Sequence, residues 1–156
     1  TFINPQTFRR VIMGTRSNIA YEKENGKVVV MYCHYDGYPE YNGRVLQEHY
    51  SHPNQATALV DNGYQSGLKE TIEESNEGRV HKEEPTTYNS VHNFLLDLQG
   101  DVEWVYLFTN NEWKVAEVKY IQLPSGDWGN KSLHTNDFTP LWAYFIKSNN
   151  AVGNQS

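Results

Sequence analysis

The stretch "SNIAYEKENGKVVVMYCHY" (residues 17–35) has the pattern of two strands joined by a tight turn. Its middle, Asn25-Gly26, is the dipeptide most typical of a two-residue hairpin loop, because both residues accept positive φ angles. We therefore expect strands over 17–24 and 27–35. The return strand carries the run VVVM, whose lack of alternation is typical of a strand covered on both faces. The pattern predicts a β-hairpin at the centre of a sheet.

The rest of the chain carries the patterns of helices and of a second hairpin. Ser51 is a good N-cap, and Gly63 and Gly100 are good helix stops. Residues 73–87 are polar and charged, so we expect a mobile loop there. Residues 139–147 fit a helix or a strand. The expected elements are helices over 42–50, 67–75 and 90–99, a helix from Ser51 to Gly63, and strands over 103–109 and 112–123 around Asn110-Asn111.

These elements predict an α+β fold. An antiparallel sheet built from the two hairpins would carry three or four helices, mostly on one face. The single domain is expected to span residues 13–147. Residues 1–12 are interpreted as an N-terminal extension or arm, and 148–156 as a disordered tail.

Composition and charge restrict the possible partners. The net charge of −6 disfavours general binding to nucleic acid, which needs clustered lysine and arginine. Cys33 is the single cysteine, so the chain has neither a disulfide framework nor a thiolate-rich metal site. The sequence has no apolar run of membrane-spanning length and no signal-peptide pattern. We expect a soluble protein of the host-cell cytoplasm, without membrane contact.

The most unusual residues stand at the end of the first hairpin, in "MYCHYDGYPEYNGR" (residues 31–44). An antiparallel hairpin turning at Asn25-Gly26 brings residues 16–18 beside residues 33–35. The two segments are therefore expected to form one surface patch. Its predicted ligand-binding residues are Arg16, Ser17, Asn18, His34, Tyr35, Asp36, Tyr38, Asn42 and Arg44.

This patch has the residue types that hold a small anion. Tyr32, Tyr35, Tyr38 and Tyr41 lie within ten residues and can stack on a base or on a partner side chain. Two arginines and the start of a helix suit phosphate or carboxylate. We expect a small anionic ligand or a host protein as partner, and a homo-oligomer formed through exposed aromatic side chains.

Other interpretations of the same residues remain open. His34 and Asp36 lie two apart and would share a side of an extended chain. They could stitch the turn through a hydrogen bond, act as a general base with its orienting carboxylate, or bind a metal together with His49 or His52. Cys33 as a nucleophile is weaker than Cys33 as a small core residue. We predict no metal and no cofactor.

Residues 13–50 resemble a family of small uncharacterised proteins of phages and prophages. The likeness rests on "MGTRSNI", on "YCHYDGYP" and on "NGRVL"; residues 103–118, "EWVYLFTNNEWKVAEV", are also similar to that family. The resemblance implies an accessory protein of a mobile element. We expect a non-enzymatic protein that counters host immunity, by binding a defence protein or by sequestering a nucleotide-type signalling molecule. The alternative is a small phosphodiester hydrolase with His34 and Asp36 as acid–base pair.

Overall fold

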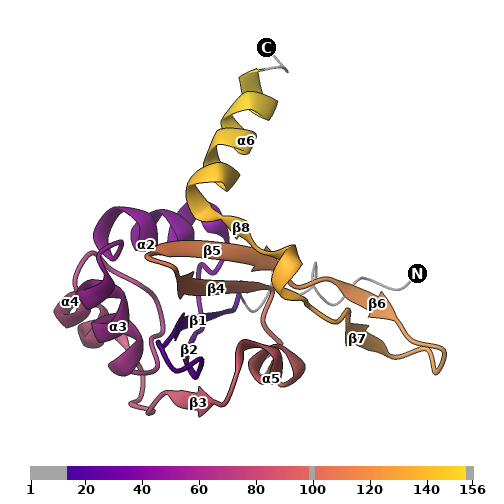
Figure 1. Cartoon of the computed structure of the whole chain (residues 1–156), viewed down its shortest axis with the longest axis horizontal. Coiled ribbons are helices and arrows are strands. Elements are labelled where there is room, and N and C mark those ends of the chain that lie inside the picture. Colours follow the sequence, from indigo (N-terminus) through magenta and orange to yellow (C-terminus); the bar gives the residue numbers. More distant parts are fainter. Residues whose placement is uncertain (1–13, 99–100, 154–156) are drawn as a thin grey trace.

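The computed structural model describes residues 14–98 and 101–153. Its centre is a six-stranded sheet in the order β3-β2-β1-β4-β5-β8, and a two-stranded arm, β6-β7, extends from the side of the domain (Figure 1). The strands are β1 (Ser17–Glu22), β2 (Val28–Cys33), β3 (Thr86–Tyr88), β4 (Trp104–Thr109), β5 (Glu112–Glu117), β6 (Tyr120–Gln122), β7 (Trp128–Asn130) and β8 (Thr139–Pro140).

The two predicted hairpins form the middle of the sheet. β1 pairs with β2 and β4 pairs with β5, both antiparallel. The hairpins meet through β1 and β4, which run parallel, so the sheet is mostly rather than wholly antiparallel. A parallel pair needs a long crossover, and the helices between β2 and β4 supply it. The edge strand β3 and the arm strand β7 were not predicted, whereas β8 begins the segment expected as helix or strand.

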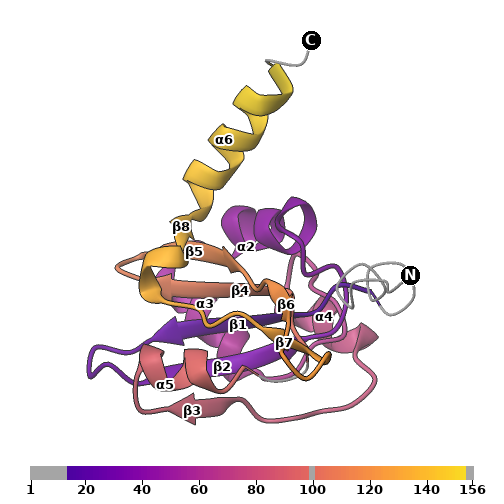
Figure 2. The same cartoon turned by 90° about the vertical axis from the view of Figure 1, so that its right-hand side faces the viewer.

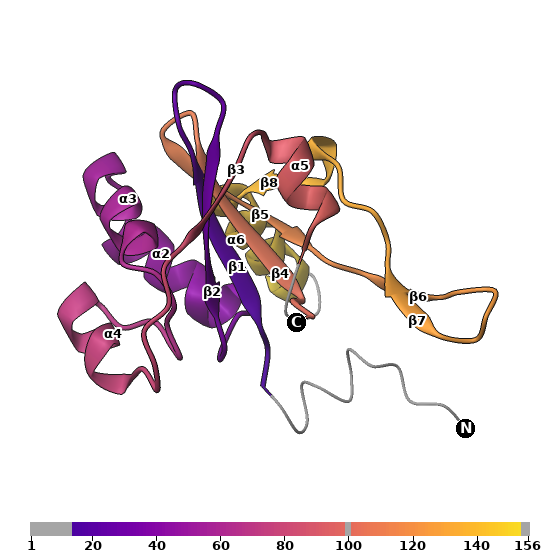
Figure 3. The ribbon, with the colours of Figure 1, turned by 90° about the horizontal axis from the view of Figure 1, so that it is seen from below.

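The helices lie mostly on one side of the sheet, as expected. Figure 3 shows α2, α3 and α4 on one side and α5 on the other, and Figure 2 shows α6 projecting away from the sheet. A π-helical turn, Pro39–Gly43, precedes α2. The helices are α2 (Arg44–His49), α3 (Pro53–Asp61), α4 (Ile72–Gly78), α5 (Val91–Leu96) and α6 (Leu141–Gly153), with a 3-10 turn at Thr135–Asp137.

The alternation of side chains along the strands divides the core into two clusters. On the closed face, strand residues such as Met31 and Tyr106 pack against α2 and α3, which contribute Leu46 and Leu59. On the open face, residues such as Val30 pack against α5 and the 131–138 segment. We use these two names below. Both sides of β2 are covered, which confirms the expectation for its apolar run.

Several predicted boundaries were wrong in detail. His52, not Ser51, is the N-cap of α3: its Nδ1 accepts from Asn54 N. The helix expected over 67–75 begins only after the cap residue Thr71. The stretch expected as a mobile loop over 73–87 contains most of α4 and the start of β3. The strand expected over 112–123 ends at Glu117, and the chain continues into the arm.

The C-terminal segment departs furthest from its prediction. Residues 139–147 form both β8 and the first turns of α6, and α6 continues to Gly153, within the tail expected to be disordered. The expected extension over 1–12 and the last residues, 154–156, lie outside the described residues. Within the described part of the chain, no helix combines the length and apolarity that a bilayer-spanning segment requires.

Candidate functional site

The chain leaves β2 through a turn whose backbone is fixed by its neighbours. Asp36 has a φ of 59°, in the left-handed region that few residues other than glycine occupy. Gly37 N donates to Thr15 O at 2.8 Å, and the Tyr106 hydroxyl donates to Gly37 O at 2.6 Å. A Cβ on Gly37 would lie 2.9 Å from Ser17 Cβ, so a larger residue does not fit. The turn joins the ends of β1, β2 and β4.

Three residues around this turn belong to the closed face. Ser17, Cys33 and Asn42 are fully buried. The Asn42 side chain donates to Ser17 Oγ at 3.3 Å and to Tyr35 O at 3.4 Å. Burial raises the pKa of the Cys33 thiol to about 12, against a smaller opposing effect of the Asn42 hydrogen bond. Cys33 is therefore the core residue expected from its position, and Ser17 and Asn42 form internal ties where the sequence predicted ligand contacts.

His34 and Asp36 do not contact one another through a hydrogen bond; each pairs with a tyrosine. The Tyr32 hydroxyl lies 2.9 Å from His34 Nδ1, and the Tyr38 hydroxyl donates to Asp36 Oδ1 at 3.2 Å. The left-handed backbone at Asp36 breaks the extended geometry that would have put both side chains on one side. Burial, and secondarily the charge of Arg16, lower the pKa of His34. His34 is therefore a neutral imidazole at neutral pH.

The metal interpretation gains no support from the histidines of the neighbouring helices. His49 lies 3.9 Å from a Glu48 oxygen and 4.0 Å from a Glu70 oxygen, while His52 caps α3. Among residues 14–98 and 101–153, no three histidine, cysteine or carboxylate side chains converge as metal ligands would.

The two arginines of the predicted patch lie in different surroundings. The Arg44 guanidinium lies 4.5 Å from the centre of the Phe145 ring, on α6, in a cation–π contact. Arg16 is close enough to His34 to affect its pKa. Tyr35 and Tyr38 are the exposed rings of the motif, with 49% and 37% of their surface accessible.

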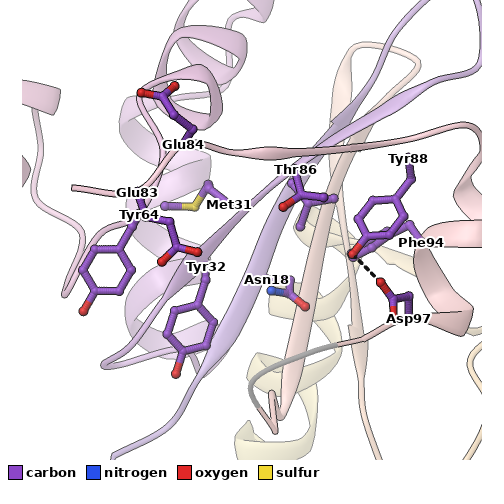
Figure 4. A pocket seen from close by; sticks show the side chains of 11 residues that line it. Asn18, Met31, Tyr32, Tyr64, Glu83, Glu84, Thr86, Tyr88, Phe94 and Asp97 are labelled. Carbon is purple, nitrogen blue, oxygen red and sulfur yellow. Dashed lines mark hydrogen bonds between the residues drawn. The ribbon is translucent and has the colours of Figure 1, made fainter. Parts of the chain in front are cut away.

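A pocket of about 220 Å³ opens on the open face, between β2, the 83–88 segment and α5. In Figure 4, Tyr32 and Tyr64 stand on one side of it, Tyr88 and Phe94 on the other, and Asn18 between them. Eleven residues line it: Asn18, Val30, Met31, Tyr32, Tyr64, Glu83, Glu84, Thr86, Tyr88, Phe94 and Asp97. Of the predicted ligand-binding residues, Asn18 alone is among them.

Asn18 is the distinctive residue of this pocket. Its side chain is 95% buried, since 5% of its surface is accessible. No hydrogen bond joins its amide to another described residue, and the amide atoms remain accessible from the pocket. An asparagine amide offers both donors and an acceptor, so one that faces a ring-lined pocket and is not bonded to another described residue can hydrogen-bond a ligand that enters.

A close approach of two distant segments places Tyr64 beside Tyr32. Gly63 has a φ of 88°, and a Cβ there would collide with Glu83 O. The next residue, Tyr64, donates its N–H to Glu83 O at 2.9 Å. The end of β2 also donates to this segment, from His34 N to Gln65 O at 3.1 Å. These contacts bring Tyr64 and Glu83 to one wall of the pocket, although both residues follow β2 by thirty positions or more.

The aromatic side chains form a continuous series beside the pocket. The His81 and Tyr64 rings stack at 3.9 Å between centroids, and Tyr64 stacks on Tyr32 at 6.0 Å. Tyr32 then meets His34, whose ring lies edge-on to Tyr35 at 4.6 Å. Such faces suit planar, conjugated ligands.

Three carboxylates make the rim of the pocket acidic: Glu83, Glu84 and Asp97. Asp97 accepts from the Tyr88 hydroxyl at 3.0 Å. Burial, and secondarily this hydrogen bond, raise the pKa of Tyr88 to about 12. These residues were not predicted as site residues, because Glu83 and Glu84 lie in a stretch interpreted as a mobile loop and Asp97 lies at the end of the helix that follows it. Glu83 and Glu84 favour donors such as amino groups at the rim.

Comparison with known proteins finds no family model, no curated protein and no solved structure that matches this chain. The resemblance to phage proteins therefore stays a prediction. The case for a function rests on the pocket and on the residues that line it.

Proposed function

We propose that this protein is a non-enzymatic binding protein that sequesters a small nucleotide-type molecule, with the base in the Asn18 pocket. One observation carries the proposal: the Asn18 amide faces the pocket between two pairs of aromatic rings and makes no hydrogen bond to another described residue. Asn42, by contrast, donates to Ser17 Oγ and to Tyr35 O within the closed face.

The chemistry of the pocket suits a nucleobase. An asparagine amide offers one acceptor and two donors side by side, and pairs with a base edge through two parallel hydrogen bonds, as asparagine does with adenine. Aromatic rings stack on bases of any sequence. The volume of about 220 Å³ suits a single base with part of its sugar rather than a whole oligonucleotide.

Charge gives the bound nucleotide an orientation. The carboxylates of Glu83 and Glu84 attract the amino group of a base and repel phosphate. Arg16 precedes Asn18 by two residues, directly before β1 begins, which is roughly 7 Å along an extended chain and on the same side of it. The phosphate would therefore extend toward Arg16 and His34, at the position where the sequence predicted an anion.

The biological role of this binding follows from the resemblance to phage proteins. A phage protein that removes a signalling nucleotide would blunt a host immune pathway without any chemical step. Direct binding to a host defence protein is the other form of this role, with the exposed rings of Tyr35 and Tyr38 as contact surface.

Hydrolysis of a phosphodiester is a second candidate. It is favoured by the lowered pKa of His34, which keeps the imidazole neutral and able to accept a proton. The orientation that a general base needs would have to come from Tyr32, since Asp36 pairs with Tyr38.

The test incubates the pure protein with a panel of cyclic and linear nucleotides, removes the unbound fraction by filtration and heat-denatures the protein. We expect one nucleotide to be retained and then released intact. Asn18→Ala should weaken its binding by about tenfold, the effect of losing about two hydrogen bonds. Asn54→Ala, at an exposed position of α3, is the matched control and should bind normally.

Three results would count against sequestration. Retention of no nucleotide would remove the small-molecule form and move the search to host proteins. Release of a cleaved nucleotide, with a rate lost in His34→Ala, would establish the hydrolase. Equal binding by Asn18→Ala and the control would place the ligand elsewhere. Light scattering of the same samples tests the predicted homo-oligomer.

A further inference from the structure

A second groove, of about 530 Å³, lies at the other edge of the sheet. It is bordered by the end of β5, the segment after β7 and α6. The strand order puts β5 and β8 at one edge and β2 and β3, which border the Asn18 pocket, at the other. The two sites therefore share no lining residue.

Three lysines line this groove: Lys119, Lys131 and Lys147. Lys131 N donates to Lys119 O at 2.6 Å, and the arm begins directly beyond them with Tyr120 opposite Asn130. Lys119 and Lys131 are therefore cross-strand neighbours with side chains on the same side. Like charges in that position destabilise a strand pair, and Lys147 adds a third from α6. Such a cost is offset when an anion lies between the lysines.

A polar group below the groove points to the same conclusion. Trp104 lines the groove from β4 with 8% of its surface accessible. Its Nε1 is buried and has no hydrogen-bond partner among the described residues. The Tyr144 ring meets the Trp104 ring edge-on at 6.3 Å between centroids. An indole N–H donates only, so the group that would satisfy it is an acceptor such as a phosphate oxygen.

The carboxylates of the groove restrict which anions fit. Glu117 and Asp137 also line it, so two negative charges stand against three positive ones. One oxygen of Asp137 accepts from His134 N at 2.9 Å, which ties that carboxylate to its own turn. A monovalent anion gains little from this balance. An anion with several charges gains more, because each of its charges can pair with a different lysine.

We propose that this groove is a second binding site, which takes the phosphate groups of a multiply charged anion such as a di- or triphosphate. Lys119 and Lys131 would hold the anion at the base of the arm, Lys147 would contact it from α6, and Trp104 would donate from below. The site is independent of the proposed nucleotide pocket, because it recognises phosphate without a base.

The experiment titrates the full chain with inorganic pyrophosphate by calorimetry, at constant ionic strength. We expect saturable binding that weakens as salt is added. Lys131→Gln should weaken it by about tenfold, the effect of losing one charge-assisted hydrogen bond. The control Lys82→Gln, an exposed lysine outside the groove, should bind as the wild type does. Asn18→Ala should also leave pyrophosphate binding unchanged, so the two proposals fail separately.

Trp104→Phe separates a contact from general charge attraction. Phenylalanine keeps a ring on the closed face and removes the N–H, so pyrophosphate affinity should fall while all three lysines remain. Thermal melting confirms that each variant is folded. Absence of saturable binding, or equal losses in Lys131→Gln and Lys82→Gln, would overturn the proposal. Unchanged affinity in Trp104→Phe would overturn the part assigned to the indole.

Discussion

Two hydrogen-bonded rings of the closed face differ from the Asn18 pocket of the open face in where their polar groups find partners. On the closed face, Trp113 Nε1 donates to Tyr50 O at 2.9 Å and the Tyr106 hydroxyl donates to Gly37 O at 2.6 Å. On the open face, the Asn18 amide has no such partner in the described part of the chain. Alternate residues of the same strand, β1, supply both faces. The difference is one between these residues and not between whole faces, because Trp104 Nε1 and Asn42 Oδ1 on the closed face also lack a partner among the described residues.

The largest expected effect concerns the single cysteine, which belongs to the closed face. Because burial raises the pKa of Cys33 to about 12, almost none of it is thiolate at neutral pH. Near pH 8, the folded protein should react with a thiol reagent about 10³-fold more slowly than the same chain in denaturant. Absorbance of the released reagent group measures both rates. Equal rates would mean that the closed face is open to solvent.

The next largest effect concerns the hydrogen bond between Tyr106, on the closed face, and the backbone of the turn at Gly37. Tyr106→Phe keeps the ring and removes the hydroxyl that donates to Gly37 O, which leaves a buried carbonyl without that donor. The free energy of unfolding should fall by about 2 kcal/mol. Urea denaturation measures it. A loss below the error of the method would show that the turn does not depend on this hydrogen bond.

A similar change on the open face should have the opposite sign. Asn18→Leu replaces an amide that is not bonded to another described residue with an apolar group of similar size, so no such bond is lost and more apolar surface is buried. The unliganded protein should gain about 1 kcal/mol in stability. The same denaturation measurement applies, and destabilisation would mean that Asn18 has a structural partner. Together with Tyr106→Phe, this change tests the contrast between these residues directly.

The sequence predicted those parts of the site that depend on local geometry. Residues 16–18 lie beside residues 33–35 as predicted, but the loop spans residues 24–26 instead of two residues, because Gly26 has a positive φ and Asn25 does not. Ser17 therefore lies opposite Cys33, one position away from the His34 that a two-residue loop would give. The side chains then continue to alternate between the two faces of the sheet as far as His34. The alternation fails at Asp36, because the left-handed backbone there ends the extended geometry.

The far wall of the pocket could not be predicted in this way. Tyr64 and Glu83 reach it because Gly63 lets two loops approach closely, and α5 brings Phe94 and Asp97. These contacts join residues far apart in sequence through irregular backbone, which has no periodic signal. The composition of a charged stretch such as 73–87 is that of a solvated loop, even where, as here, the stretch forms a helix and a strand that pack on the domain.

The smallest expected effect is the pH dependence contributed by His34. Its pKa is lowered in the folded state, so below the ordinary histidine value of about 6.5 the unfolded chain binds this proton more readily. The stability due to a neutral His34 is therefore complete above about pH 6.5, and is lost as the pH falls through the lower pKa of the folded state. His34→Gln should flatten the dependence of unfolding free energy on pH over that range. Parallel curves for the two proteins would contradict it.

The cause of this shift can be separated into its two parts by changing Arg16. Burial is the larger cause and the Arg16 charge the smaller, so Arg16→Gln should raise the pKa of His34 only part of the way toward its ordinary value. Histidine ring resonances followed by NMR through a pH titration measure this. A full return would mean that His34 is solvated and shifted by charge alone. Since a phosphate placed beside Arg16 would raise the same pKa, the titration repeated with the retained nucleotide locates the phosphate on the open face.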